Sequence, residues 1–474
     1  MRTGYDLIVV GHNLTDLATA ALASKQGLKT LLIEIDGRDS PTASEGAPPL
    51  PFAADSLIDV QSLREILSIL EIESPLTVRR PILQVLFLDR RIDIASDRFP
   101  LEAEMEREFG QSPSLAALYD SARELSELIM ERWQNIASPK NGTPRSFRRS
   151  LLPLSIAIKR RQFKELMRKA SADSHIRSFL AAQVIENTRF IPAASDPLAS
   201  ALGVAIPFLE IGEITAGTEQ LRDILLQNIE TNNGAVLREC TKVSLSGSSE
   251  IVVQGSFEEA DDALYTGNFV YIGEIARKNI ATALLLNGQA VHRKYFGNCC
   301  LYPLIIRSVL NENILPERLA PRAVIINDAE KPPQNGNYIF LSSHPHAEKD
   351  GSRMLTVSLL MEEFPECWTP DMIARLVRST FLQMSHFFPF LNDITPAIDF
   401  PRILEESLTE GKRHCRVSMK GMGAFRSILS HPFFVSKGGC LIGGMECFSG
   451  LIWGNTFLKG PAVVKWVKER KKYV

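Results

Sequence analysis

The sequence predicts an α/β fold that opens with a strand, a helix and a second, parallel strand, and three observations predict it. The apolar run Tyr5–Val10 ends at Gly11, as expected of a strand buried on both faces. Small apolar residues at 17–23 have the composition of a tightly packed helix, which Gln26-Gly27 closes. Lys29–Glu34 is again apolar and predicts the next parallel strand.

Later segments are assigned in the same way, from apolar periodicity and turn residues. The sequence predicts a loop at 36–55, a helix at 57–70 and a mostly helical region at 100–200. The segment 212–217 leads into a helix at 221–229, which is followed by a strand at 235–237 and short strands within 242–272. We further expect strands at 301–307 and 338–342, a helix at 372–388, a strand with glycines at 440–444 and a final helix at 461–472.

Composition narrows the class of protein. The chain has 474 residues, 45% of them hydrophobic and 23% charged, and its formal net charge is −2. Such a balance is typical of a globular protein and excludes nucleic-acid binding as an overall property, because phosphate binding needs a cationic surface. Seven cysteines without a CxxC spacing indicate neither a disulfide framework nor a zinc site. The chain lacks a long apolar run and a signal-peptide pattern, and this predicts a cytoplasmic protein.

The junction between the first strand and the first helix has the frame of a dinucleotide site. A helix N-terminus after a strand and a glycine offers unpaired N–H groups to a pyrophosphate, commonly in the spacing G-x-G-x-x-G. In this chain Gly11 keeps the first position, whereas Asn13 and Asp16 replace the second and third glycines. Glu34, at the end of the second strand, stands where an acidic side chain can bind a ribose.

The two replacements affect this site differently. Asn13 tolerates unusual backbone conformations, but its side chain crowds a position where backbone approaches phosphate. The Asp16 carboxylate stabilises the dipole of its own helix and repels a pyrophosphate in the same field. A cofactor-binding loop and a Rossmann scaffold without tightly bound dinucleotide therefore both remain open.

Three segments resemble the FAD-dependent superfamily of phytoene desaturases, retinol saturases and amine oxidases, to which the non-enzymatic Rab GDP-dissociation inhibitors also belong. They are Tyr5–Glu34, the stretch from Ile214 through Ala216-Gly217 to Val243, and Gly438–Gly444 before the last helix. The resemblance implies that Val243 lies where backbone meets the adenine, and that Gly443 and Gly444 lie on the flavin-contacting strand.

The departures from that family are as informative as the resemblance. The usual glycine pair after the second strand is missing from Arg38–Thr42, and Gly444 stands where the family commonly has an aspartate. The acidic residue of Leu14-Thr15-Asp16 is similar to the first loop of the GDP-dissociation inhibitors, which bind isoprenyl lipid without redox chemistry. We therefore expect FAD to bind weakly or not at all.

The resemblance implies an FAD/NAD(P)-binding Rossmann-type domain with a second α+β substrate or lid domain. We assign residues 1–85, 205–275 and 430–474 to the first and 86–204 and 276–429 to the second. The first functional hypothesis is a flavin-dependent oxidoreductase of phytoene-desaturase type acting on a hydrophobic, isoprenoid-like substrate, with the redox chemistry carried by the flavin. The alternative is a non-enzymatic lipid-binding or assembly protein. The sequence identifies no catalytic acid or base.

Two further segments carry unusual side chains. Nine cations lie between Arg145 and Lys169 against Glu165 alone, interleaved with apolar residues that include Phe163 and Met167. This pattern suits an anionic membrane surface with those two side chains inserted, and a solvated helix face is the alternative. Ser343–His346 offers two imidazoles but no third metal ligand, so a polar loop is the better interpretation and no metal site is predicted.

Overall fold

The computed structural model describes most of the chain at the level of individual residues. The described residues are 4–11, 13–35, 57–94, 98–137, 147–188, 191, 197–246, 250–255, 263–273, 285–286, 289–290, 300–345, 351–362, 368–388, 391, 417–418, 434–435, 440–442 and 459–471.

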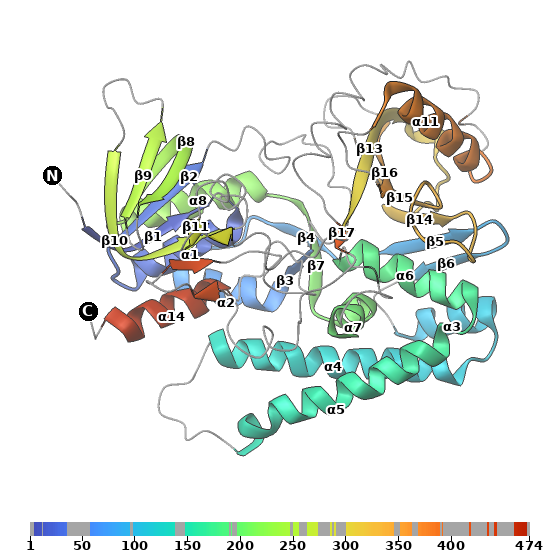
Figure 1. The fold of residues 1–474 in the computed structure, drawn as a ribbon, viewed down its shortest axis with the longest axis horizontal. Helices are drawn as coiled ribbons and strands as arrows, with labels where there is room; N and C mark the ends of the chain where they lie inside the picture. The colour runs from blue at the N-terminus through green and yellow to red at the C-terminus, as the bar shows by residue number, and fades with distance from the viewer. Residues whose placement is uncertain are drawn as a thin grey trace.

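A mixed sheet forms the first half of the molecule, on the left in Figure 1. Its parallel part has the order β8, β2, β1, β10 and β19. Strand β18 pairs antiparallel with β19, and β9 pairs antiparallel with both β8 and β10. The strands are β1 (Gly4–Val10), β2 (Thr30–Ile35), β8 (Ala235–Ser246), β9 (Glu250–Gly255), β10 (Ala263–Ile272), β18 (Phe434–Val435) and β19 (Cys440–Ile442). Segments far apart in the sequence thus meet in one Rossmann-type sheet.

Three helices pack around this sheet: α1 (Leu14–Lys25), α8 (Thr218–Thr231) and α14 (Lys459–Lys471). The small residues of α1 are almost entirely buried, which lets α8 and α14 pack closely against it. Gly217 precedes α8 with φ 87°, and a Cβ there would lie 2.2 Å from the carbonyl oxygen of Pro75. Only glycine fits that position without strain.

A second seven-stranded sheet, on the right in Figure 1, has the order β17-β13-β16-β15-β14-β5-β6. Its outer face packs against α11 (Pro370–Met384) and forms a separate hydrophobic cluster. The strands are β5 (Leu83–Phe87), β6 (Arg91–Ile94), β13 (Cys300–Asn311), β14 (Arg322–Ile326), β15 (Tyr338–Pro345), β16 (Ser352–Met361) and β17 (Val417–Ser418). A 3-10 turn follows β13 at Glu312–Ile314.

Five helices lie beneath and between the sheets in Figure 1, with α4 packed against α5 and α7. They are α3 (Arg98–Phe109), α4 (Pro113–Ala137), α5 (Phe147–Ala170), α6 (Ser174–Thr188) and α7 (Pro197–Ala205), the last followed by a 3-10 turn at Ile206–Phe208. The two sheets are bridged by a small antiparallel sheet of β3 (Leu57–Asp59), β7 (Ile211–Ala216) and β4 (Thr77–Arg79), and a hairpin joins β11 (Leu285–Leu286) to β12 (Gln289–Ala290). None of the described helices is long and apolar enough to cross a membrane.

Several expectations from the sequence need correction. The helix expected at 57–70 starts only at Val60, because Leu57–Asp59 pairs with β7 as a strand. The segment before α8, to which the sequence assigned no element, is a strand, Ile211–Ala216. The polar loop expected at 343–346 is wrong for Ser343–Pro345, which continues β15 in register with β16. These strands form because they pair with strands distant in the sequence. Local periodicity of apolar residues does not predict such pairing.

Candidate functional site

The first candidate site lies at the carboxyl ends of two neighbouring parallel strands. Strands β1 and β10 pair in register from Gly4 to Val10, and Gly11 and Gly273 follow them directly. The Gly273 N–H donates to the Val10 carbonyl at 2.7 Å, and the Gly11 N–H donates to the Ile33 carbonyl at 3.1 Å. This fold class places a dinucleotide at the carboxyl ends of such strands, and we call that place, beside the two glycines, the crevice.

Asn13 begins helix α1 as its N-cap. Its side-chain oxygen accepts a hydrogen bond from the backbone N–H of Asp16 at 2.9 Å, and its φ of −77° is extended. Asn13 therefore does not adopt the left-handed geometry that asparagine tolerates. The side chain instead satisfies one of the helix N–H groups that a phosphate would otherwise use.

Asp16 fills the space above the two glycines. A Cβ atom added to Gly11 would lie 2.1 Å from Asp16 Oδ2, and one added to Gly273 would lie 2.1 Å from the same oxygen. The side chain is buried, with the residue only 1% exposed. The carboxylate therefore lies against both strand ends, in the first turn of α1, where the helix dipole stabilises a negative charge.

Glu34 lies at the end of β2 and is engaged by the protein itself. Its Oε1 accepts a hydrogen bond from Arg222 of α8 at 2.5 Å, and the residue is buried. Burial raises the pKa of Glu34, against the opposing pull of Arg222 and Arg238. A ribose hydroxyl at this position would compete with an ion pair that is already formed.

The other predicted cofactor residues are only partly placed. Val243 belongs to β8 and pairs with Val253 of β9, beyond the stretch of β8 that pairs with β2. Gly443 and Gly444 directly follow β19 and lie outside the described residues. Arg38–Thr42 also lies outside them. The structure thus brings Gly11, Asn13 and Asp16 together, and the assigned roles of the remaining residues stay predictions.

In this arrangement the crevice does not fit the pyrophosphate of FAD. The space above the strand ends holds a buried carboxylate, and the N-cap side chain already accepts a helix N–H. Two like charges in the same helix-end field repel each other, and the acidic residue at the ribose position is paired with Arg222. An incoming dinucleotide would first have to displace the Asp16 side chain.

A second group of buried charged side chains, which sequence analysis missed, lies between the bridging sheet and the second large sheet. Arg322 of β14, buried at 2% exposure, pairs with Glu213 of β7 at 2.8 Å and with Glu186 of α6 at 3.3 Å. Arg79 of β4 pairs with the other oxygen of Glu213 at 2.8 Å. Burial alone would raise the pKa of Glu213, but the two arginines lower it to about 2.

Three buried hydroxyls continue this polar region across the inner face of the second sheet. Arg322, Ser342 and Thr356 are directly opposite one another on β14, β15 and β16, and Arg307 of β13 is opposite Thr356. Opposite residues on antiparallel strands share a face, so these side chains form one polar row. Ser358 lies on the same face, two residues from Thr356. We call Arg307, Arg322, Ser342, Thr356 and Ser358 the polar row.

The hydroxyls of the polar row are buried without partners among the described residues, as are those of Ser343 on the opposite face of β15 and of Ser121 and Ser126 on α4. Ser342, Thr356 and Ser358 are at most 1% exposed, and within the described part of the chain none of their hydroxyl oxygens has a hydrogen-bond partner. A buried polar group without a hydrogen-bond partner lowers the free energy of unfolding by on the order of 1–3 kcal/mol. Three on neighbouring strands therefore form a costly arrangement for a purely structural surface.

His344 continues the same face of β15 beyond Ser342. Its Nε2 is buried without a hydrogen-bond partner among the described residues. Burial, aided by the positive charges of Arg322, Arg79 and Arg353, lowers the pKa of His344 to about 4, although Glu213 opposes the shift. The imidazole is therefore neutral at physiological pH, so one of its nitrogens donates a hydrogen bond and the other accepts one.

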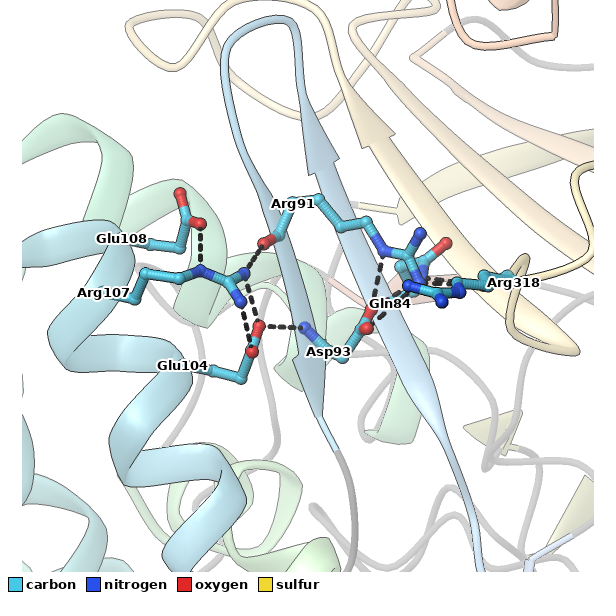
Figure 2. Close-up of polar contacts among 7 residues, drawn as sticks. All are labelled: Gln84, Arg91, Asp93, Glu104, Arg107, Glu108 and Arg318. Carbon is cyan, nitrogen blue, oxygen red and sulfur yellow. Dashed lines mark hydrogen bonds and ion pairs between the residues drawn. The ribbon is translucent and has the colours of Figure 1, made fainter.

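A third polar cluster, drawn in Figure 2, is satisfied by its own members. Asp93 of β6 accepts from Gln84 Nε2 at 2.6 Å and from Arg91, while the Arg318 carbonyl accepts from both donors. Arg107 of α3 donates to Glu104 and also to the Arg91 carbonyl. The hydrogen bonds hold the β5–β6 hairpin to α3, so the cluster has a structural role.

One sequence signal could have revealed the polar row. Serine, histidine and threonine stand at 342 and 344 and again at 356 and 358, although Ser343 interrupts the alternation on β15. Period-two polarity predicts that one face of each strand is polar. It cannot predict that the two faces are adjacent, because that depends on the antiparallel register of β15 and β16.

Neither a protein-family model nor a curated protein sequence matches the chain. Solved structures do match along its full length. A triple mutant of putrescine oxidase has a TM-score of 0.58 at 13% identity, with 99% of each chain covered. Putrescine oxidase bound to putrescine gives 0.55 at 13% identity over all of both chains, and cyclohexylamine oxidase from Brevibacterium oxydans gives 0.52 at 15% over 99% of each.

These similarities confirm the expected fold class. The chain has an α/β fold similar to that of putrescine oxidase and cyclohexylamine oxidase, with a Rossmann-type sheet in one part and a second large sheet in the other. At 13–15% identity the likeness concerns the fold. What the crevice can bind is decided by its own residues.

Proposed function

We propose that this chain is a small-molecule-binding protein on a flavoprotein scaffold that does not hold FAD as a resident cofactor. The observation that carries the proposal is the buried Asp16 carboxylate, which lies against Gly11 and Gly273 where a pyrophosphate would enter. The Glu34–Arg222 ion pair supports it, because the acidic residue at the ribose position already has a charged partner.

The same arrangement is in keeping with the sequence likeness to GDP-dissociation inhibitors, which use this scaffold without redox chemistry. An acidic side chain at the third-glycine position is common to both. A lipid-like ligand is one form of this proposal. A binding function needs neither the dinucleotide crevice nor a catalytic acid or base. In this proposal the second domain contacts the ligand.

A second candidate is a flavin-dependent oxidoreductase of phytoene-desaturase type acting on a hydrophobic substrate. The observation that favours it is the match to amine oxidases over 99% or more of both chains, second domain included. In this case FAD binds only when the Asp16 side chain leaves the crevice. The required displacement lowers the affinity, since about 1.4 kcal/mol already costs a factor of ten.

The two functions are separated by the absorption spectrum and by FAD titration of three proteins: wild type, Asp16→Gly and Asp16→Asn. We expect wild type to be colourless after dialysis. Asp16→Gly should bind FAD at least about tenfold more tightly, because it removes both the charge and the volume. Asp16→Asn keeps the volume and so measures the charge alone.

The control variant is Asp371→Gly, which removes an exposed aspartate from the first turn of α11, a helix remote from the crevice in Figure 1. It should leave FAD affinity unchanged. A wild-type protein that keeps stoichiometric flavin through dialysis would contradict the first function and establish the second. Equal, weak FAD binding by wild type and Asp16→Gly would show that Asp16 is not the obstacle.

A further inference from the structure

We propose that the exposed face of helix α5 binds an anionic lipid bilayer, with the side chains of Leu154 and Ile158 inserted among the acyl chains. The proposed function concerns what the chain binds. This inference goes beyond it, to where the chain works and how it is oriented there. Its evidence is independent of the dinucleotide crevice.

Contacts within the protein fix which side of α5 faces solvent. Ile156 and Phe163 are fully buried and belong to the main hydrophobic core. Leu154 and Ile158, one turn apart, are 57% and 51% exposed. At about 3.6 residues per turn, the buried pair and the exposed pair point to opposite sides of the helix. The core therefore holds α5 from one side and leaves two large apolar side chains in solvent on the other.

This exposed pair differs from the other apolar side chains on the surface. Among the described residues, the remaining exposed large apolar side chains, such as Leu88 and Leu382, each lie in a different segment. Single exposed apolar residues are normal on a soluble protein. Two on one turn of a helix form a small apolar ridge that can be buried in a single step.

The cations around the ridge suit an anionic surface. Arg161, Lys164 and Lys169 are exposed, and none of them has an ion-pair partner within the described part of the chain. Arg161 continues the stripe of Leu154 and Ile158 at the i+7 position, and the two lysines lie on either side of that stripe. A ridge of apolar side chains flanked by cations is the pattern of a helix that lies in a bilayer interface.

The acidic side chains beside this face already have charged partners. Three of them line the open groove between α4 and α5. Each lies within 4.0 Å of a basic nitrogen, in the pairs Asp120–Arg123, Glu124–Lys159 and Glu165–Arg168. The three cations without partners therefore give the face a local positive excess, which attracts anionic headgroups.

The dimensions of the face agree with this contact. From Leu154 to Lys169 it extends about 22 Å along the helix axis. A helix lying in the interface plane buries its apolar side about 5–10 Å into the boundary between headgroups and acyl chains. Leu154 and Ile158 then reach the acyl chains, while the flanking cations stay at the level of the headgroups.

The first experiment measures insertion directly. Full-length Ile158→Trp is titrated with vesicles of phosphatidylcholine and phosphatidylglycerol whose acyl chains carry bromine, a quencher of tryptophan fluorescence. We expect quenching beyond that of wild type, which has 4 tryptophans. The matched control is Leu382→Trp, which adds a tryptophan at a position 63% exposed on α11. It should be quenched no more than wild type.

The second experiment measures affinity for the same vesicles. Leu154→Ser combined with Ile158→Ser should weaken binding at least about tenfold, because burial of even one such side chain accounts for that factor. The melting temperature should stay that of wild type, since both side chains are exposed. Leu88→Ser combined with Leu382→Ser removes two side chains of 66% and 63% exposure elsewhere, and this variant should bind as wild type does.

Three outcomes would overturn the proposal. The first is vesicle binding without additional quenching of Ile158→Trp, which would show adsorption without insertion. The second is a wild type that does not bind the vesicles at low salt. The third is a concentration-dependent dimer that the two serine changes on α5 abolish, without vesicle binding, which would assign the face to a second copy of the chain. Failure of the proposed function is separate, because Asp16→Gly changes flavin affinity and should bind the vesicles as wild type does.

Discussion

At the residue scale, Glu213 shows how the buried charges hold the two halves of the molecule together. It comes from the bridging sheet, and its two oxygens pair with Arg79 on one side and with Arg322 of the second sheet on the other. A buried carboxylate with only one charged partner would destabilise the fold, because one ion pair need not offset the loss of hydration. With two arginines the carboxylate stays ionised, which its pKa of about 2 reflects.

The lowered pKa of Glu213 makes stability depend on pH in a defined window. The folded-state pKa of about 2 lies below the ordinary value of 4.5, so the stabilisation is complete above pH 4.5 and is lost as pH falls toward 2. The difference corresponds to about 3 kcal/mol. Glu213→Gln should therefore lower the free energy of unfolding by about 3 kcal/mol at pH 7, and the gap to wild type should shrink below pH 4.5.

The measurement is urea unfolding of both proteins at pH 7, 4.5 and 3. Glu330→Gln is the control, because Glu330 pairs with Arg177 at the surface with its side chain 75% exposed. Exposed pairs contribute about 0–1 kcal/mol, so that variant should unfold like wild type at every pH. A gap between Glu213→Gln and wild type that stays constant with pH would contradict the ion-pair explanation.

At the element scale, the sequence predicts what local periodicity determines and misses what pairing determines. Strands β1 and β2 and helix α1 lie within a few residues of their predicted bounds, because an apolar run and a small-residue helix are local signals. The position of Asp16 in the first turn of α1 could be predicted, because its place in the loop after β1 is a local feature. Arg222 as the partner of Glu34 could not, since it lies 188 residues away.

Helix α5 shows the same limit. The expected membrane insertion of Phe163 is wrong, because its side chain is fully buried in the hydrophobic core, and Met167 packs partly against the same core. The exposed apolar side chains are instead Leu154 and Ile158, at 57% and 51% exposure. When charged residues lie on several sides of a helix, the sequence does not indicate which face is buried against other helices.

Membrane attachment through α5 remains a prediction, now with a defined face. Arg161, Lys164, Arg168 and Lys169 are exposed, whereas Lys159 pairs with Glu124 of α4 at 2.5 Å. Arg168 also pairs with Glu165 of the same helix at 3.4 Å. Each exposed cation near an anionic leaflet contributes on the order of 1 kcal/mol before screening. We expect wild type to sediment with liposomes containing phosphatidylglycerol at low salt, and a variant with these four exposed cations changed to Gln to remain in solution.

The control for this test removes the same number of exposed charges elsewhere. Changing Arg64, Lys331, Arg375 and Arg378 to Gln takes four cations from exposed positions outside α5. This variant should sediment as wild type does if α5 is the contact surface. Equal loss of sedimentation in both variants would indicate a general charge effect, and no sedimentation of wild type would leave α5 a solvated helix.

At the scale of the whole molecule, one hydrophobic core extends through both large sheets. It contains Leu7 of β1, Leu22 of α1, Phe340 of β15 and Trp466 of α14. The second cluster joins the outer face of the second sheet to α11 and to the segments beside them. The inner faces of both sheets therefore share one continuous core. Figure 1 shows α14, near the C-terminus, packed beside α1 and the first sheet.

Because the core is continuous, a core substitution on α14 should also lower the stability of the second large sheet. Trp466 packs edge-on against Phe269 at 5.3 Å, and Arg470 lies 4.4 Å from the centre of its ring. Trp466→Ala should lower the free energy of unfolding by about 3–5 kcal/mol, as large-to-small core substitutions do.

The measurement is amide hydrogen exchange. Because the core is shared, exchange should accelerate together in β1 and in β15. Leu382→Ala on α11, at a side chain 63% exposed, should leave both rates unchanged. If β1 loses protection while β15 keeps it, the two sheets unfold as independent units.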